Sequence, residues 1–461
     1  MMVRKINRAI TRIGFFVLSW FYGMVTDYNT ASGDQLFVGT QGVPTIFGAQ
    51  GHVYQYLSDT TWRDLNPTKN IGQAIMRLVF FRDTLYVATQ THSGYGGCDF
   101  GGCGRGQVWK YHGRPNFWTQ VGGNLDNSVM VLLVYNSTLY AGTSLVEKSP
   151  NVGNLYKLVA GNWILVGTGG STGWRAGIVT DLFPPLTPIP QIYLGELNVD
   201  AFARYTDGSG LVPLQNLGGS CVWGFREYQG ALYSGHWHGP VYKTTDGISW
   251  TLAHQTDQDH NWGMEVFQGK LYLGTGSGDG LSPGRLFTFD GTKWEEVHSW
   301  PAKVNGEGVT SLATDTDQTR LYIGLGVPDG YYTGDGVAEV WQYDGIHFTR
   351  ISRPDHFGGG VQSLLTHFTG CTTFDDLDQT ISDAVIDNEG IRNSLLSKAR
   401  NARKQYDRGN LRASGNILCA LLHEVDAQDG KHIEPASAQE IRDCVKSLAE
   451  ALRFSAPAPK L

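Results

Sequence analysis

A short pattern of hydrophobic and small residues occurs seven times between residues 36 and 324. Each copy has Leu or Ile, then an aromatic residue, any residue, and Gly or Ala, and successive copies start 39 to 54 residues apart. The alternation is typical of a half-buried β-strand. The copies lie at 36–39, 85–88, 139–142, 192–195, 232–235, 271–274 and 321–324.

A second alternating segment follows each copy, and another apolar segment precedes it, as at 129–135. Several of the second segments run into Asp-Gly and then an aromatic residue, as at Asp246, Asp290 and Asp344. Asp-Gly predicts a hairpin with a type I′ turn, which needs φ > 0 at both central residues. Each unit therefore predicts four antiparallel strands. The second segments are 53–56, 108–111, 155–158, 201–204, 241–244, 286–289 and 340–343.

A period of this length with four strands per unit is typical of a propeller blade. One four-stranded sheet cannot cover both of its apolar faces, whereas sheets arranged radially cover one another. The small residue after the aromatic suits close packing between neighbouring sheets. We therefore predict a mainly β fold, a seven-bladed β-propeller over residues 31–370. The apolar segment 358–368 looks like the first strand of a blade, but no second strand follows it. We expect it to complete the first blade.

From Phe374 onwards the spacing of apolar residues becomes helical. Asn388 is expected to cap the second helix, Gly409-Asn410 to end it, and Asp429-Gly430 to end the third. We predict a small all-α helical bundle over 371–454 and a tail over 455–461. The apolar stripes are Ile391, Leu395, Ala399 and Ala402; Ile417, Leu421 and Val425; and Ile441, Val445 and Leu448.

Two motifs of this helical region resemble those of the FIMAH domain of secreted bacterial proteins. They are Gly-Ile-x-Asn-Ser-Leu-Leu at 390–396 and Gln-x-Gly-Lys-x-Ile at 428–433. The resemblance covers the helical region alone and implies an accessory extracytoplasmic module rather than a catalyst. The blades resemble those of secreted bacterial propellers with Leu-Tyr-x-Gly-Thr and Tyr-x-x-Asp-Gly-x-x-Trp patterns. The segment 242–250 is similar to a sialidase Asp-box, one residue short, which implies a turn and no glycosidase activity.

Composition supports a large β protein and excludes other classes. The chain has 60 glycines, 12% aromatic residues and 17% charged residues, unlike a disordered chain, a long coiled coil or a collagen. A net charge of −7 argues against a nucleic-acid partner. Arg4, Lys5, Arg8 and Arg12 precede an apolar run, 13–25, that is too short for a membrane span but suits a secretory signal. Residues 1–30 are thus a signal or anchor, or the start of the first strand, and we expect a secreted or cell-surface protein with no integral membrane domain.

Six cysteines are too few for a disulfide scaffold. Cys98 and Cys103 lie in a Gly-rich stretch where a disulfide would close a loop in an oxidising compartment. Zinc ligation is the other interpretation, although no second Cys/His pair stands at a matching spacing. Cys419 and Cys444 on neighbouring predicted helices either pair or are core residues.

The loops after the motif strands gather on one face of a propeller, around its channel, so that face is the expected ligand site. Tyrosines beside carboxylates can stack on sugar rings and form hydrogen bonds with them. His236 and His238 have the i, i+2 spacing that would place both imidazoles on one side of an extended chain. The candidate ligand-binding residues are His92, His236, His238, Asp329, Tyr331, Tyr332 and Asp335.

The sequence predicts no cofactor and no metal site, because the two histidines His236 and His238 alone do not make one. A metal bound with the help of His92, His254 and His260 on other loops is the alternative. Calcium bound by Asp279, Asp329 and Asp335 is an alternative to ordinary solvated turns, although no regular D-x-D-x-D loop is present.

We therefore expect a monomeric, non-catalytic binding or scaffold protein with a glycan or a protein as partner. The alternative is a polysaccharide lyase or hydrolase that uses carboxylates at the mouth of the channel. Glu196, Glu265 and Glu307 are near predicted strands, but their spacing singles out no acid and base.

Overall fold

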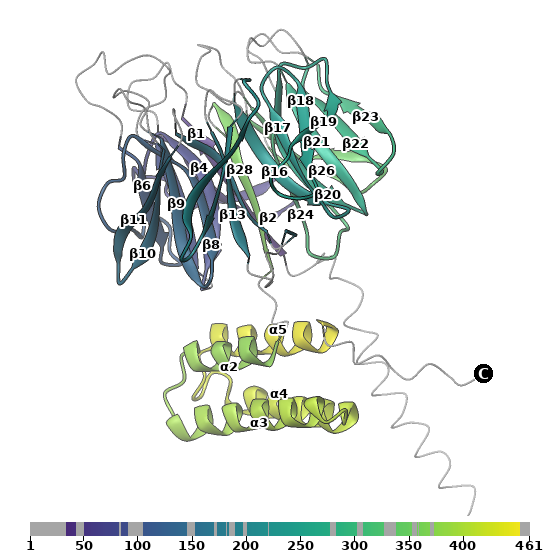
Figure 1. The fold of residues 1–461 in the computed structure, drawn as a ribbon. Helices are drawn as coiled ribbons and strands as arrows, with labels where there is room; N and C mark the ends of the chain where they lie inside the picture. The colour runs from purple at the N-terminus through teal and green to yellow at the C-terminus, as the bar shows by residue number, and fades with distance from the viewer. Residues whose placement is uncertain are drawn as a thin grey trace, which may run out of the picture. The chain divides into compact units, whose positions relative to one another are not determined.

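The computed structural model describes residues 34–42, 50–82, 84–90, 105–144, 153–169, 173–180, 182–183, 190–196, 201–219, 221–276, 283–301, 308–326, 338–352, 357, 359–368 and 373–451. The chain divides into two compact units. The first is Gln35–His367, and the second contains the helices between Phe374 and Ala451. Figure 1 shows the strands of the first and the helices of the second.

The 28 described strands form three four-stranded antiparallel sheets and one 16-stranded sheet. Single residue pairs join groups of four within the large sheet, at Gln41–Ala74, Gln90–Ser128 and Gly326–Gly360. We call each group of four strands a blade. The first blade has β28 (Gly360–Phe368), β1 (Asp34–Gln41), β2 (Val53–Ser58) and β3 (Thr61–Asp64). The second has β4 (Ala74–Phe81), β5 (Thr84–Gln90), β6 (Gln107–Tyr111) and β7 (Trp118–Gln120). The third has β8 (Ser128–Tyr135), β9 (Thr138–Ser144), β10 (Gly153–Val159) and β11 (Asn162–Gly169).

The fourth blade has β12 (Trp174–Thr180), β13 (Gln191–Glu196), β14 (Ala201–Thr206) and β15 (Gly210–Asn216). The fifth has β16 (Val222–Tyr228), β17 (Ala231–His236), β18 (Pro240–Thr244) and β19 (Thr251–Gln255). The sixth has β20 (His260–Phe267), β21 (Lys270–Gly276), β22 (Arg285–Phe289) and β23 (Trp294–Ser299). The seventh has β24 (Gly308–Thr314), β25 (Leu321–Gly326), β26 (Glu339–Tyr343) and β27 (Phe348–Arg350).

The first strand of each blade is the innermost one, because these strands contact one another from blade to blade, from β4 through β8, β12, β16 and β20 to β24. Every copy of the repeated motif lies in the second strand of its blade. The prediction of a mainly β propeller with a helical C-terminal region is therefore confirmed.

The last strand, β28, completes the first blade by pairing with β1. The amide of Gly359 donates to the carbonyl of Gln41 at 2.8 Å, and Gln362 Nε2 donates to Gln41 Oε1 at 2.9 Å. On its other side β28 contacts β24, since the amide of Leu364 donates to Ser311 Oγ at 2.9 Å. The two ends of the propeller thus meet in one sheet, as the apolar pattern of 358–368 predicted.

The small residue of the motif is required by packing against the next blade. A Cβ atom added to Gly195 would lie 2.4 Å from Val222 Cγ1, and one added to Gly274 would lie 2.3 Å from Val309 Cγ1. In both cases the contacted valine belongs to the innermost strand of the following blade. The predicted role of the small residue in sheet-to-sheet packing is confirmed.

The Asp-Gly turns connect strands as predicted, but the predicted type I′ conformation is wrong. Gly247 has φ of 74°, whereas Asp246 is not among the described residues with positive φ. Asp246 Oδ1 instead accepts the amides of Ile248 at 2.8 Å and Ser249 at 2.7 Å. The aspartate is therefore used as a hydrogen-bond acceptor that closes the turn. Two consecutive positive φ angles occur elsewhere, for example at Gln229 (48°) and Gly230 (73°) between β16 and β17.

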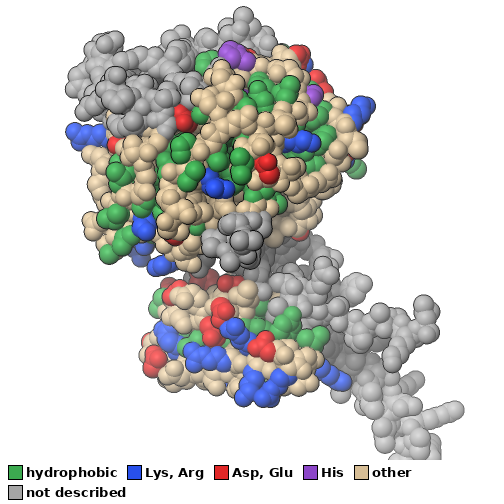
Figure 2. Space-filling view, viewed as in Figure 1, with side chains coloured by type: hydrophobic (Ala, Val, Ile, Leu, Met, Phe, Trp, Pro, Cys, Tyr) green, Lys and Arg blue, Asp and Glu red, His purple; other side chains and the backbone are tan. Residues whose placement is uncertain are grey.

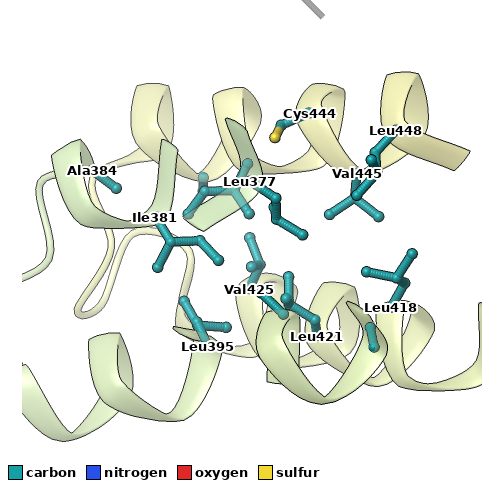
Figure 3. Close-up of a cluster of buried hydrophobic side chains, with 14 of the residues drawn as sticks. Leu377, Ile381, Ala384, Leu395, Leu418, Leu421, Val425, Cys444, Val445 and Leu448 are labelled. Atoms are coloured by element: carbon teal, nitrogen blue, oxygen red, sulfur yellow. The ribbon is translucent and has the colours of Figure 1, made fainter. Parts of the chain in front are cut away.

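The second unit has four described helices: α2 (Phe374–Asp383), α3 (Glu389–Asp407), α4 (Leu411–Gln428) and α5 (Pro435–Ala451). The predicted stripes lie in or against one core, and Figure 3 shows Leu395, Leu421, Val425, Val445 and Leu448 pointing into it. The helix predicted before the one that Asn388 caps is α2, which begins with a capping box between Thr373 and Asp376.

The predicted helix ends of the second unit are confirmed. Asn388 Oδ1 accepts the amides of Gly390 at 2.9 Å and Ile391 at 3.3 Å, so it caps α3. Gly409, with φ of 77°, separates α3 from α4. The basic residues of α3 are matched by acids, with Arg400 near Asp378 and Arg403 near Asp375. Figure 2 shows this mixture of blue and red side chains on the helical unit.

Cys419 and Cys444 do not pair with one another. Cys444 is buried and disulfide-bonded, whereas Cys419 is exposed and is a free thiol. The predicted pair Cys98 and Cys103 lies outside the described residues. No helix in the described ranges is long and apolar enough to cross a membrane.

Candidate functional site

The innermost strands share a β-bulge near the end at which they start. The register skips one residue in each of β4, β8, β12, β16, β20 and β24. Bulges are common next to functional sites, where they re-aim a side chain. The extra residues are Met76, Met130, Arg175, Trp223, Trp262 and Thr310.

Consecutive bulge residues contact one another across the blades. Met76 and Met130 share one buried cluster, and Arg175 Nη1 donates to the Met130 sulfur at 3.2 Å. The guanidinium of Arg175 lies 4.1 Å from the centre of the Trp223 ring, a cation–π distance. Trp223 and Trp262 meet edge to face at 6.2 Å. Five of the six bulge residues, all except Thr310, thus form a connected, buried layer on the innermost strands.

A stack of four aromatic rings leads from this layer to the surface. His238 stacks on Trp237 with ring centres 5.1 Å apart, and Trp237 stacks on His260 at 5.1 Å. His260 in turn stacks on Trp262 at 4.8 Å. The exposed fraction of the side chain is 65% for His238 but 3% for His260, so one end of the stack is in solvent and the other is in the core.

A single carboxylate connects the two histidines of the stack. Asp259 Oδ1 lies 3.1 Å from His238 Nδ1, and Asp259 Oδ2 lies 3.0 Å from His260 Nδ1. The hydrogen bond with Asp259 orients the imidazole of His238, whereas the contact with His260 is one of distance only. Figure 2 shows histidine side chains exposed at the surface of the propeller.

Two short loops place these groups. Trp237 and His238 follow β17, and the amide of Trp237 donates to the carbonyl of Cys221 at 3.1 Å. His238 has φ of 64° and Gly239 has φ of 92°, so the chain turns back at once into β18. A Cβ atom on Gly239 would lie 2.5 Å from the carbonyl oxygen of Thr256, which explains the glycine there. Asp259 immediately precedes β20.

The two predicted histidines lie in different surroundings. His236 is fully buried, its Nε2 lies 2.7 Å from Ser234 Oγ, and its ring packs edge-on against Tyr242. The expectation that His236 and His238 share one side of an extended chain is wrong, because β17 ends at His236 and His238 has a positive φ. His238 alone of this pair is at the surface stack.

The other candidate ligand residues, His92, Asp329, Tyr331, Tyr332 and Asp335, lie outside the described residues, as do Asp279 and Glu307. Sequence reasoning missed Trp237 and Asp259, and it considered His260 only as a possible metal ligand. The alternation of His and Trp in 236–238 and in 260–262 was the available signal, because two such segments at the ends of strands in adjacent blades meet at one face.

Two buried carboxylates of the propeller, Glu265 and Glu339, are engaged in ion pairs. Glu265 on β20 pairs with Arg226 on β16, and burial lowers the pKa of Arg226 to about 10. Glu339 on β26 pairs with Arg350 at 3.1 Å.

A raised carboxylate pKa occurs away from the stack. Burial raises the pKa of Asp315, whose Oδ1 accepts the amides of Thr319 and Arg320, both at 2.8 Å. Asp315 lies in the hairpin between β24 and β25, at the opposite end of the strands from the aromatic stack. Within the described ranges, no group of three His, Cys, Asp or Glu residues could hold a metal ion.

No protein-family model and no curated protein match the chain. Solved structures resemble it in fold. A 6-phosphogluconolactonase-like protein from Bacteroides uniformis has a TM-score of 0.50 at 11% identity, over 72% of this chain and 99% of its own. A similar protein from Bacteroides fragilis has a TM-score of 0.48 at 11% identity, over 74% and 100%. The WD40 propeller domain of Doa1 has a TM-score of 0.42 at 8% identity, over 64% and 90%. At 11% identity the likeness to the first of these structures shows the fold alone.

Proposed function

We propose that this protein is an extracytoplasmic glycan-binding propeller and that a sugar ring docks on the exposed imidazole of His238. The observation that carries the proposal is the four-ring stack, whose outermost ring is 65% exposed while the ring below it, Trp237, is half-buried. A flat ring with an apolar face offers contact area to the C–H face of a sugar. The carboxylate of Asp259 lies beside that ring and can accept sugar hydroxyls.

The stack is suited to binding because it is already ordered. Asp259 holds His238 from one side, and the carbonyl of His238 accepts a hydrogen bond from Gln255 Nε2 at 2.8 Å. Little side-chain freedom remains to be lost when a ligand docks, and less lost entropy means higher affinity for the same contacts.

The helical unit supports the extracytoplasmic part of the proposal. It resembles the FIMAH module of secreted proteins in sequence, and it contains the disulfide-bonded Cys444. Disulfides persist mainly in oxidising compartments. We propose that this unit is an accessory module and that the propeller holds the ligand site.

The test is a glycan-array screen of the full chain, followed by affinity measurement for any hit with H238A and W237A. The matched control is H347A, because His347 is 75% exposed and also lies beside an aspartate, Asp344. We expect H238A and W237A to weaken binding about tenfold, the scale of one lost aromatic contact, and H347A to leave it unchanged. Unchanged binding by H238A and W237A contradicts the site. If the chain binds a protein and no glycan, the proposed class of ligand is wrong.

One observation favours the alternative of a polysaccharide lyase or hydrolase. An exposed imidazole oriented by a carboxylate is the usual arrangement of a general base, and His238 with Asp259 has it. Product analysis of a bound glycan distinguishes the two functions. Turnover that disappears in D259N while binding persists establishes the enzyme, and an unchanged glycan establishes the binding protein.

A further inference from the structure

Arg77 occupies a position at which the other blades have small or apolar residues. This position comes directly after the bulge residue and pairs with the small residue of the motif, as Arg77 does with Ala88. At Gly224 even a Cβ atom would lie 2.8 Å from the carbonyl oxygen of Trp262, so the space next to the following blade is narrow. Packing between the blades therefore gives no reason for an arginine at position 77. The equivalent residues are Val131, Ala176, Gly224, Gly263 and Ser311.

The charge of Arg77 is poorly compensated. Among the described residues it has no acidic partner, and its hydrogen bond there runs from Nη1 to the carbonyl of Met76 at 2.9 Å. The charged group that acts on it is another cation, Arg175. Surrounding protein and then Arg175 lower the pKa of Arg77 to about 10. Yet Arg77 as a whole residue is only half-buried, so part of its side chain is exposed.

Arg77 is thus partly exposed on an innermost strand, without an acidic partner among the described residues and within reach of the charge of a second arginine. Such a group is suited to bind negative charge. We propose that Arg77 binds an oxyanion, the carboxylate, sulfate or phosphate group of a ligand, at the innermost strands of the propeller. The planar guanidinium matches all three groups through two parallel hydrogen bonds. An anion there would also relieve the repulsion between Arg77 and Arg175. This inference is independent of the glycan site at His238.

The experiment uses the full chain and three probes, sodium acetate, sodium sulfate and sodium phosphate, each titrated against chloride at constant ionic strength. Thermal shift and calorimetric titration are measured for the wild type, R77M, R77K and the control R63M. Arg63 is an exposed arginine on β3 of the first blade. We expect a saturable response in the wild type and R63M, and binding at least about tenfold weaker in R77M. R77K should be intermediate, because an ammonium keeps the charge without the planar geometry.

The three probes distinguish the source of the oxyanion. A response to acetate alone indicates a carboxylate ligand, and a response to sulfate or phosphate indicates a sulfated or phosphorylated one. The proposal is overturned if R77M responds as the wild type does, or if the wild type shows no saturable response to any probe. We expect R77M to melt in chloride at or above the wild-type temperature, because it removes a repelled cation. If R77M does not fold, an R77K response equal to that of the wild type overturns the proposal. H238A should keep the anion response, so failure of one proposal does not affect the other.

Discussion

Gly324 of β25 lies so close to Val361 of β28 that an added Cβ atom would be 2.5 Å from Val361 Cγ1. The contact joins the seventh blade to the strand that completes the first blade, so it lies at the closure of the ring. The same relationship between motif residue and following blade occurs at Gly195 and Gly274.

We expect G324A to destabilise the propeller by about 1–3 kcal/mol, the usual cost of overpacking a filled site. The measurement is chemical denaturation followed by tryptophan fluorescence. The matched control is G123A, because a Cβ atom at Gly123 would meet no atom within 4 Å and its φ is not positive. Equal stability of G324A and the wild type would show that β25 and β28 can move apart without loss.

A second prediction concerns the acid stability of the turn at Asp246. Hydrogen bonds from the amides of Ile248 and Ser249 lower the pKa of Asp246 from 3.8 to about 2. A lowered folded-state pKa means that the ionised carboxylate stabilises the fold above pH 4 and that this contribution disappears as pH falls toward 2. We expect D246N to lower the melting temperature at pH 7 by about 2 °C and to show a weaker pH dependence between pH 4 and 2.

The control for this change is D59N. Asp59 is in the hairpin between β2 and β3 and has φ of 49°, a conformation that asparagine adopts readily. The melting temperature of D59N should follow that of the wild type across the same pH range. Parallel pH profiles for D246N and the wild type would mean that Asp246 stabilises the turn only as a neutral acceptor.

The repeat was readable from the sequence because one steric requirement recurs in every blade. A Leu-aromatic-x-Gly segment alternates at strand period, and its glycine is needed wherever a following blade presses on it, as Val222 presses on Gly195. The hairpins at the Asp-Gly turns could also be predicted, because their signal lies within a few residues of the sequence. Their conformation could not be predicted, because the acceptor role of Asp246 depends on where the amides of Ile248 and Ser249 lie.

The candidate site was harder to read, because its members come from separate loops. His238 was recognised from the His-Trp-His segment, but its partner Asp259 comes from the next blade junction. Spacing along the chain contains no information on that contact. Arg77 was missed for a different reason, since a lone arginine in an apolar strand has no local signature until the register shows that other blades have a small residue there.

A third prediction tests the ion pair between Arg226 and Glu265. The side chain of Glu265 is 9% exposed and that of Arg226 is 35% exposed, so each charge loses much of its hydration in the fold. Removing only Glu265 leaves Arg226 without its partner, and we expect E265A to cost about 2–3 kcal/mol. The double variant R226L/E265L should cost less than E265A, because neither charge remains. Additive effects of R226L and E265L in a double-mutant cycle would exclude coupling between the two side chains.

The last prediction concerns the disulfide of the helical unit. Cys444 lies in the same core as Leu377, Leu421 and Leu448, so a cross-link there restrains a buried point of α5. Because a disulfide reduces the freedom of the unfolded chain, we expect C444S to destabilise the helices by about 2–4 kcal/mol. The measurement is hydrogen exchange of α2 to α5 in the full chain, with and without a reducing agent. C419S is the control, since Cys419 is exposed and not cross-linked, and its exchange should match the wild type. Reductant should accelerate exchange in the wild type and leave C444S unchanged. If the wild type exchanges at the same rate in both conditions, the cross-link does not hold this unit together.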